Sequence, residues 1–180
     1  MRILQLALRI PYPLRDGGAI AIYNNTKYLS AAGHEVTLLA LNTTKHHQDP
    51  SVMAEHARVI TTDIDTTPRA VPALKNLLFG RLPYNVERFD VPEHHERLAK
   101  LLQAEQFDVI LFERVYLGVY LETIRKYSDA PVILRAHNVE YEIWQRLASN
   151  ESNLAKRLLY KQLALRGEAF ERSVLPRFDG

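Results

Sequence analysis

The sequence predicts an α/β fold built on a doubly wound, mostly parallel β-sheet. Short apolar runs, typical of strands buried on both faces, alternate along the chain with segments whose apolar residues have helical spacing. The first strand and helix are joined by a loop rich in proline and glycine, and no internal repeat or low-complexity linker interrupts the alternation. Because strands that alternate with helices form parallel sheets covered by helices, we expect a single domain over residues 1–180.

The first 41 residues predict a strand, a loop, a helix and a second strand. The apolar run from Ile3 to Leu8 suits a buried strand, and the segment 11–18 suits a turn. Apolar residues then keep a helical spacing up to Gly33, which is placed to end the helix. Residues 34–41 form the next apolar run. Parallel strands joined through a helix cross over right-handed, which buries the sheet between helices.

The same two patterns predict the later elements. We expect further strands at 59–62, 107–112 and 131–135. We expect further helices at 70–78, 93–106, 117–127, 140–147 and 154–173. The chain ends at Gly180 directly after the last of these helices, where another strand is expected. We therefore expect that Gly180 is not the natural end of the protein.

Composition and charge exclude several kinds of protein. Twenty-three Lys and Arg residues against 21 Asp and Glu residues give a net charge of +2, so bulk electrostatics do not indicate a nucleic-acid partner. The absence of cysteine excludes disulfides, thiolate metal sites and cysteine nucleophiles. No stretch approaches the ~20 apolar residues that cross a bilayer, and Gln5 and Arg9 interrupt the opening run too early for a signal peptide. We therefore expect a cytoplasmic protein.

A polar and glycine-rich segment follows the first predicted strand. It consists of Arg15, Asp16, Gly17 and Gly18. Ligands of open α/β sheets bind outside the carboxyl ends of the strands. Two glycines let a ligand approach the backbone, and the start of the following helix offers free N–H groups to a phosphate. The segment therefore predicts an anion site, with a plain tight turn as the equally favoured alternative.

Two more polar segments follow later strands at the same predicted edge. Glu113 and Arg114 end the strand 107–112, and they indicate either a binding site or a Glu–Arg pair at the surface. His137 and Asn138 follow the next strand. His137 is placed to bind a hydroxyl group or to act as a polar anchor, and Asn138 is suited to cap the helix that follows.

Some suggestive patterns are better explained by exposed positions. Asp63 and Asp65 have the D-x-D spacing of metal-dependent sugar transferases, but two carboxylates are a minimal set of metal ligands and a solvated loop is favoured. Neighbours on a helix point about 100° apart, so the pair His94–His95 is poorly placed to share a metal and is predicted to be solvated, as is His46–His47. We expect no metal and no cofactor.

Several segments, taken together, resemble the N-terminal domain of the family 4 retaining glycosyltransferases, which have the GT-B fold. They are the Asp-Gly-Gly sequence at 16–18, Leu-Ser-Ala-Ala-Gly-His-Glu-Val at 29–36, Phe-Asp-Val-Ile at 107–110, Arg-Ala-His-Asn-Val-Glu-Tyr at 135–141 and Glu-Ala-Phe-Glu-Arg at 168–172. The resemblance implies two Rossmann-like domains with the active site between them. The N-terminal domain binds the acceptor, and the C-terminal domain binds the nucleotide-sugar donor.

The resemblance also implies roles for the residues at the predicted edge. Gly17 and Gly18 would reach towards the donor diphosphate, with Arg15 and Asp16 beside the diphosphate or the acceptor. His137 would lie near the transferred sugar. The donor-binding domain, with its E-x7-E motif, is absent from these 180 residues. Because neutralising the diphosphate supplies much of the stabilisation of the transition state, we expect this chain to be nearly inactive alone.

The leading hypothesis is therefore the acceptor-binding domain of a hexosyltransferase that acts on a glycan or a lipid-linked acceptor. The alternative is a non-catalytic α/β module that binds an anion or a nucleotide; an oxidoreductase is disfavoured because no G-x-G-x-x-G motif is present. Lys156, Arg157, Lys161 and Arg166 cluster on the last helix. A solvated helix face is the favoured interpretation of this cluster. The alternative is peripheral contact with anionic lipid at the inner face of the membrane. The same helix is also a candidate for dimer contacts.

Overall fold

A computed structural model of residues 1–180 contains five parallel strands in the order β3-β2-β1-β4-β5. The strands are β1 (Arg2–Ala7), β2 (Glu35–Thr43), β3 (Arg58–Ile64), β4 (Val109–Phe112) and β5 (Val132–Leu134). The chain builds outwards from β1 to β3 and then returns to the other side of β1, where Leu4 lies opposite Thr37 of β2 and Ile110 of β4. The predicted doubly wound parallel sheet is confirmed, with its topological switch point beside β1.

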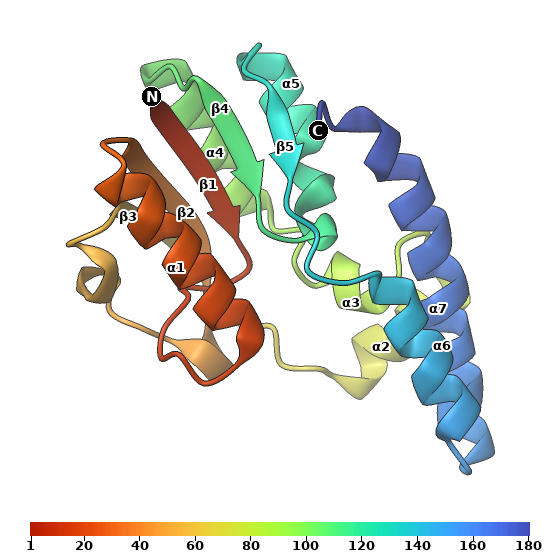
Figure 1. The fold of residues 1–180 in the computed structure, drawn as a ribbon. Coiled ribbons are helices and arrows are strands. Elements are labelled where there is room, and N and C mark those ends of the chain that lie inside the picture. Colours follow the sequence, from red (N-terminus) through yellow and green to blue (C-terminus); the bar gives the residue numbers. More distant parts are fainter.

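Helices cover both faces of this sheet (Figure 1). They are α1 (Gly17–Ala31), α2 (Ala70–Phe79), α3 (Tyr84–Glu87), α4 (Pro92–Ala104), α5 (Leu121–Tyr127), α6 (Glu140–Asn150) and α7 (Leu154–Val174). Short 3₁₀ turns occupy Thr44–His46, Pro50–Met53, Val115–Tyr120 and Leu175–Arg177. The predicted helix at 117–127 is thus a 3₁₀ turn followed by α5, and α3 was not predicted. No helix is long and apolar enough to span a membrane.

The alternation of side chains along the strands divides the core between the two faces. Leu4 and Leu6 of β1 join the larger apolar cluster, which includes side chains of α4 and α5 and reaches Val174 of α7. Leu38 and Ala40 of β2 belong to a smaller cluster on the other face. Apolar burial on both faces is what the near-continuous apolar strands predicted.

Helices α6 and α7 form a hairpin that extends beyond the carboxyl edge of the sheet (Figure 1). The backbone N–H of Tyr141 donates to Glu171 Oε1 at 2.8 Å, which ties the start of α6 to α7. Helix α7 lies close to Gly118, where an added Cβ would come within 3.2 Å of Val174. The last residues then run beside β5, where Asp179 donates its N–H to Val132.

Candidate functional site

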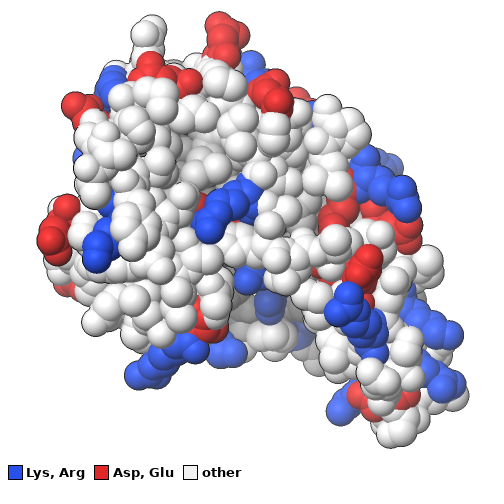
Figure 2. Space-filling model, in the orientation of Figure 1, with Lys and Arg blue, Asp and Glu red and all other residues white.

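A cavity of about 710 Å³ lies at the carboxyl ends of β1, β2, β3 and β4. Its lining comes from the segments that follow these strands, from the start of α1 and from the stretch between α3 and α4: Leu8, Arg9, Asp16, Gly18, Ile22, Thr43, Thr44, Lys45, His46, Thr66, Thr67, Pro68, Arg88, Phe89 and Arg114. Figure 2 shows a hollow below the sheet, between the lobe that carries α1 and the α6–α7 hairpin, with Lys and Arg side chains on its wall.

A second hollow of about 440 Å³ lies at the opposite edge of the sheet. Arg2, Glu35 and Arg58 line it, at the amino ends of the strands. Ligands of open parallel sheets bind beside the topological switch point at the carboxyl ends. We therefore assign the candidate site to the carboxyl-edge cavity.

The carboxyl-edge cavity is positively charged. Four of its residues are basic, Arg9, Lys45, Arg88 and Arg114, whereas Asp16 is its single carboxylate. Burial, followed by the charges of Arg9 and Lys45, lowers the pKa of His46 below its ordinary value of 6.5. Basic walls of this kind attract anions and raise their local concentration.

The start of α1 contributes Asp16 and Gly18 to the cavity. Asp16 is the N-cap residue of α1, because its Oδ1 accepts the N–H of Ala19 at 3.0 Å, and its Oδ2 pairs with Arg9. The hydrogen bond from Ala19 and the pairing with Arg9 hold the pKa of Asp16 below its usual 3.8. Arg15 and Gly17 are exposed and do not line the cavity.

Of the two glycines, only Gly18 lies against other groups of the site. An added Cβ would come within 3.2 Å of Asp16 Oδ1 and 3.3 Å of Arg114 Nη2. The same atom at Gly17 would meet nothing within 4 Å. Neither glycine has a positive φ, so the close approach at Gly18, and not backbone strain, is what favours glycine there.

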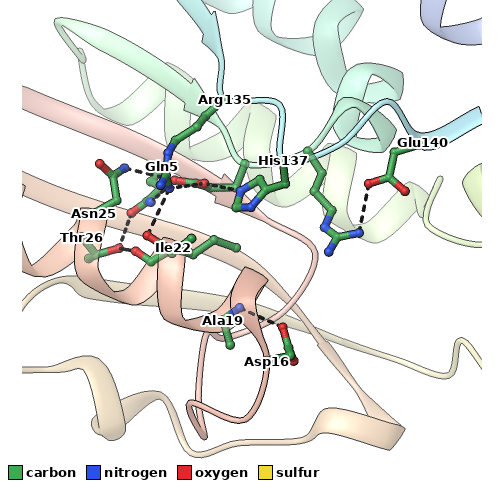
Figure 3. Close-up of polar contacts among 12 residues, drawn as sticks. Gln5, Asp16, Ala19, Ile22, Asn25, Thr26, Arg135, His137 and Glu140 are labelled. Atoms are coloured by element: carbon green, nitrogen blue, oxygen red, sulfur yellow. Dashed lines mark hydrogen bonds and ion pairs between the residues drawn. The ribbon is translucent and has the colours of Figure 1, made fainter. Parts of the chain in front are cut away.

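Glu113 lies at the centre of a buried polar network beside this cavity. Figure 3 labels four of its partners, Gln5, Asn25, Arg135 and His137, which converge from separate parts of the chain. The side chain of Glu113 is fully buried and accepts hydrogen bonds from Gln5, from Asn25 at 3.2 Å, from Arg135 at 3.1 Å and from His137 at 3.0 Å. These donors come from β1, α1 and the segment after β5. A buried carboxylate is tolerated only when charge and hydrogen bonds compensate it, and four donors do so here.

The network corrects the prediction of a surface pair between Glu113 and Arg114. Successive residues of extended chain point to opposite sides, so Glu113 is directed inwards to Arg135 while Arg114 is directed into the cavity. Arg114 pairs instead with Glu140 at 3.2 Å, at the start of α6. This pair links the end of β4 to the α6–α7 hairpin.

His137 is held in one orientation by Glu113. A carboxylate only accepts hydrogen bonds, so the Nε2 atom of His137 carries a proton. In the neutral ring Nδ1 is then an acceptor, which can receive a hydrogen bond from a hydroxyl group. His137 is not among the residues that line the 710 Å³ cavity; its side chain is 10% exposed.

The prediction that Asn138 caps the following helix is wrong. Asn138 is exposed, and α6 begins one residue too late for its side chain to reach the free N–H groups. Val139 occupies the N-cap position and makes no side-chain capping bond. Instead, Glu171 of α7 accepts the N–H of Tyr141.

The prediction of solvated histidines is wrong for His94. Its side chain is fully buried, Nδ1 lies 2.8 Å from Thr62 Oγ1, and burial lowers its pKa to about 3. The two aspartates of the D-x-D sequence, Asp63 near the end of β3 and Asp65 directly after it, have separate partners: Asp65 pairs with Arg69 at 2.5 Å, and Asp63 lies 3.6 Å from His47.

The predicted basic cluster on α7 is smaller in the structure. Arg166 donates to the carbonyl groups of Asn76 at 2.7 Å and Leu77 at 3.0 Å, near the end of α2. Its guanidinium therefore binds within the protein and is not part of an exposed basic face. Lys156 and Lys161 remain exposed.

Sequence reasoning missed most of the basic wall and most of the Glu113 network. Arg9 follows the carboxyl end of β1, so the rule that selected Arg114 also applies to it. Gln5 was visible as the single polar residue inside an apolar run. Lys45 and Arg88 carry no local signal, because only the tertiary fold brings them to the cavity.

Comparisons with known proteins agree with this fold and add a family. A model of Glycosyltransferase Family 4 matches residues 15–170. No curated protein matches the chain. Among solved structures, the C-terminal domain of a hydrogenase from Pyrococcus furiosus is similar, with 16% identity over 74% of this chain and 89% of that one and a TM-score of 0.52. At such identity it supports the fold alone.

Two further solved structures are similar over most of this chain but only part of theirs. The heptosyltransferase WaaC of E. coli, solved with ADP-2-deoxy-2-fluoro heptose, has 16% identity over 98% of this chain and 49% of its own, with a TM-score of 0.37. A ugt transferase from Siraitia grosvenorii, solved with UDP, has 11% identity over 86% of this chain and 32% of its own, with a TM-score of 0.41. The chain thus spans about half of the first protein and a third of the second.

Proposed function

The chain belongs to glycosyltransferase family 4, and from this we propose that it is the acceptor-binding N-terminal domain of a retaining enzyme. That enzyme would transfer a hexose from a nucleotide sugar to a glycan or a lipid-linked acceptor. The observation that carries the proposal is the basic cavity at the carboxyl edge of the sheet, because the substrates of such a transfer include a diphosphate.

The glycine end of the cavity is suited to the donor diphosphate. Gly18 lies in the first turn of α1, where the helix dipole favours negative charge, and its missing Cβ lets Arg114 approach the start of the helix. Arg114 lies directly beside it. As the bond to the sugar breaks, negative charge grows on the leaving diphosphate, and fixed donors at this point stabilise it.

The Glu113–His137 pair is suited to orient the transferred sugar. Glu113 fixes the ring of His137, so that Nδ1 is available to a sugar hydroxyl in one direction only. A held hydrogen bond of this kind lowers the barrier by placing the reacting carbon against the acceptor. Arg135, which also donates to the carbonyl of Ala21, holds the carboxylate against α1.

The proposal includes a second, donor-binding domain across the cavity from this one. Lipid-linked acceptors would bring the enzyme to a membrane surface, which the exposed Lys156 and Lys161 would face. The alternative function, a module that binds an anion without chemistry, uses the same basic cavity but requires no second domain.

A nucleotide-sugar screen separates these two functions. The chain 1–180 and a longer protein that carries the donor-binding domain are each incubated with a panel of nucleotide sugars and acceptors, and sugar transfer is measured by mass spectrometry. We expect transfer from the longer protein and almost none from the chain alone. Anion binding by both proteins with transfer by neither would support the binding module and refute the proposed function.

A further inference from the structure

The carboxyl-edge cavity has a second basic end, separate from Gly18 and Arg114. Lys45 follows β2, and Arg88 lies between α3 and α4 beside the residues that follow β3. In the order of the sheet, β2 and β3 lie two and three strand spacings from β4, roughly 10 and 14 Å at ~4.8 Å each. A diphosphate held at the β4 side therefore does not neutralise the charge on the β3 side.

Arg88 is incompletely partnered within the protein. Its Nη1 donates to the carbonyl of Thr66 at 3.2 Å, and its guanidinium lies 5.0 Å from the centre of the Phe89 ring. Its Nε is buried without a hydrogen-bond partner, and no carboxylate lies within 4.0 Å of its nitrogens. Of the two terminal nitrogens, only Nη1 has a partner within the protein, so Nη2 is free to donate to a ligand in the cavity that Arg88 lines.

The carboxylates at the end of β3 and in the cavity have other partners. Asp65 pairs with Arg69, Asp63 lies 3.6 Å from His47, and Asp16 pairs with Arg9 at the start of α1. Lys45 makes no ion pair, and it lines the cavity together with Arg88. The β3 side therefore presents two cations that no protein carboxylate neutralises.

We propose that Lys45 and Arg88 bind a phosphate group carried by the acceptor. This inference rests on the proposed function, which places the acceptor in this cavity. Arginine donates two parallel hydrogen bonds to phosphate, lysine adds a compact charge, and Thr67 lines the same cavity. A neutral glycan would leave both cations uncompensated, whereas a phosphate neutralises them.

The binding test titrates the chain with inorganic phosphate and follows the heat released. We expect Lys45→Gln and Arg88→Gln each to raise the Kd about tenfold, which is the loss of one charge-assisted contact. Arg81→Gln is the matched control, because Arg81 is an exposed arginine of the same segment that does not line the cavity. Circular dichroism checks that each variant is folded. If Arg88→Gln is unfolded, the phosphate affinity of Lys45→Gln alone tests the site.

Three results would overturn the phosphate site. One is a Kd for phosphate that is the same in Lys45→Gln and Arg88→Gln as in the unchanged chain. Another is loss of phosphate binding in Arg114→Gln alone, which would place the anion at the glycine end instead. The third is absence of phosphate binding by the unchanged chain.

Two probes distinguish a soluble phosphate from a lipid phosphate. Glucose 6-phosphate is the soluble probe, and phosphatidylcholine vesicles with and without phosphatidylinositol are the lipid probe. If binding of one probe weakens in Lys45→Gln and Arg88→Gln, the site is supported and that probe identifies the phosphate as soluble or lipid-borne. If binding of neither probe weakens in these variants, the site is contradicted.

Sugar transfer separates this inference from the proposed function. In the longer protein, Lys45→Gln should raise the KM for a phosphorylated acceptor about tenfold and leave the KM for the donor unchanged. Transfer that is insensitive to Lys45 would refute the acceptor-phosphate site but not the transferase. Phosphate binding through Lys45 and Arg88 without any transfer would retain the anion site and refute the proposed function.

Discussion

At the scale of single residues, the site depends on a carboxylate that has no contact with solvent. Glu113 gathers donors from three parts of the chain, and its position fixes which nitrogen of His137 carries a proton. A buried charge of this kind is costly unless its partners are all present. The network therefore couples the orientation of His137 to the folding of α1 against β1, through Asn25 and Gln5.

Removing the charge of Glu113 should destabilise the fold. Glu113→Gln leaves Arg135 without its carboxylate and presents an amide to donors that need an acceptor, so we expect a loss of ~3 kcal/mol in the free energy of unfolding, measured with urea. Glu122→Gln is the control, because Glu122 pairs with Arg177 at the surface with 79% of its side chain exposed. Equal effects of the two changes would refute the central role of Glu113.

The buried His94 predicts a dependence of stability on pH. Its pKa is lowered from 6.5 to about 3 in the folded chain, so as pH falls below 6.5 the unfolded chain takes up a proton that the folded chain does not. The free energy of unfolding should therefore decrease by about 1.6 kcal/mol between pH 6.5 and pH 5. Urea unfolding of His94→Asn should lack this decrease; an identical slope in both proteins would contradict the burial argument.

Sequence patterns select polar residues at strand ends but not their partners. Glu113 and His137 were identified from their places after β4 and β5, and the structure brings them together. The failures at Asn138 and His94 have a common cause. Helix boundaries shift by a residue or two, which moves Asn138 off the cap position, and packing between elements buries His94, which no local pattern encodes.

At the scale of elements, the first residues of helix α1 determine which groups lie at its start. Asp16 caps the helix and pairs with Arg9. Gly18, which has no Cβ, lets Arg114 lie against the first turn. The loop, helix and strand boundaries of this unit were close to those predicted from proline, glycine and apolar spacing. The sequence could not predict that a Cβ would be crowded at Gly18 and not at Gly17, because this difference depends on where Arg114 lies.

A matched pair of alanine substitutions tests the difference between the two glycines. Gly18→Ala places a methyl group against Arg114 and Asp16, so binding of pyrophosphate to the chain should weaken several-fold. Gly17→Ala meets no neighbour, so it should leave binding unchanged and raise the free energy of unfolding by about 0.5 kcal/mol through the unfolded state. Titration calorimetry measures the binding; equal weakening in both variants would exclude a specific role for Gly18.

At the scale of the whole molecule, the order of the strands places the site. Because the order in which strands are added reverses beside β1, the segments after β2 and β3 meet those after β1 and β4 around one cavity. The doubly wound sheet and this edge could be predicted from the alternation of strands and helices. The charge of the cavity could not, because Lys45 and Arg88 are brought there by 3₁₀ turns and a short helix with weak sequence signals.

The most direct test of the account is the rate of sugar transfer by the longer protein when His137 is replaced. His137→Ala removes the group that Glu113 orients, so we expect the rate to fall by about 100-fold, the size of a lost positioning contact. His47→Ala is the control, because His47 is an exposed histidine that lies beside Asp63 and has no contact with Glu113. A rate for His137→Ala equal to that of His47→Ala would contradict the site described for this domain.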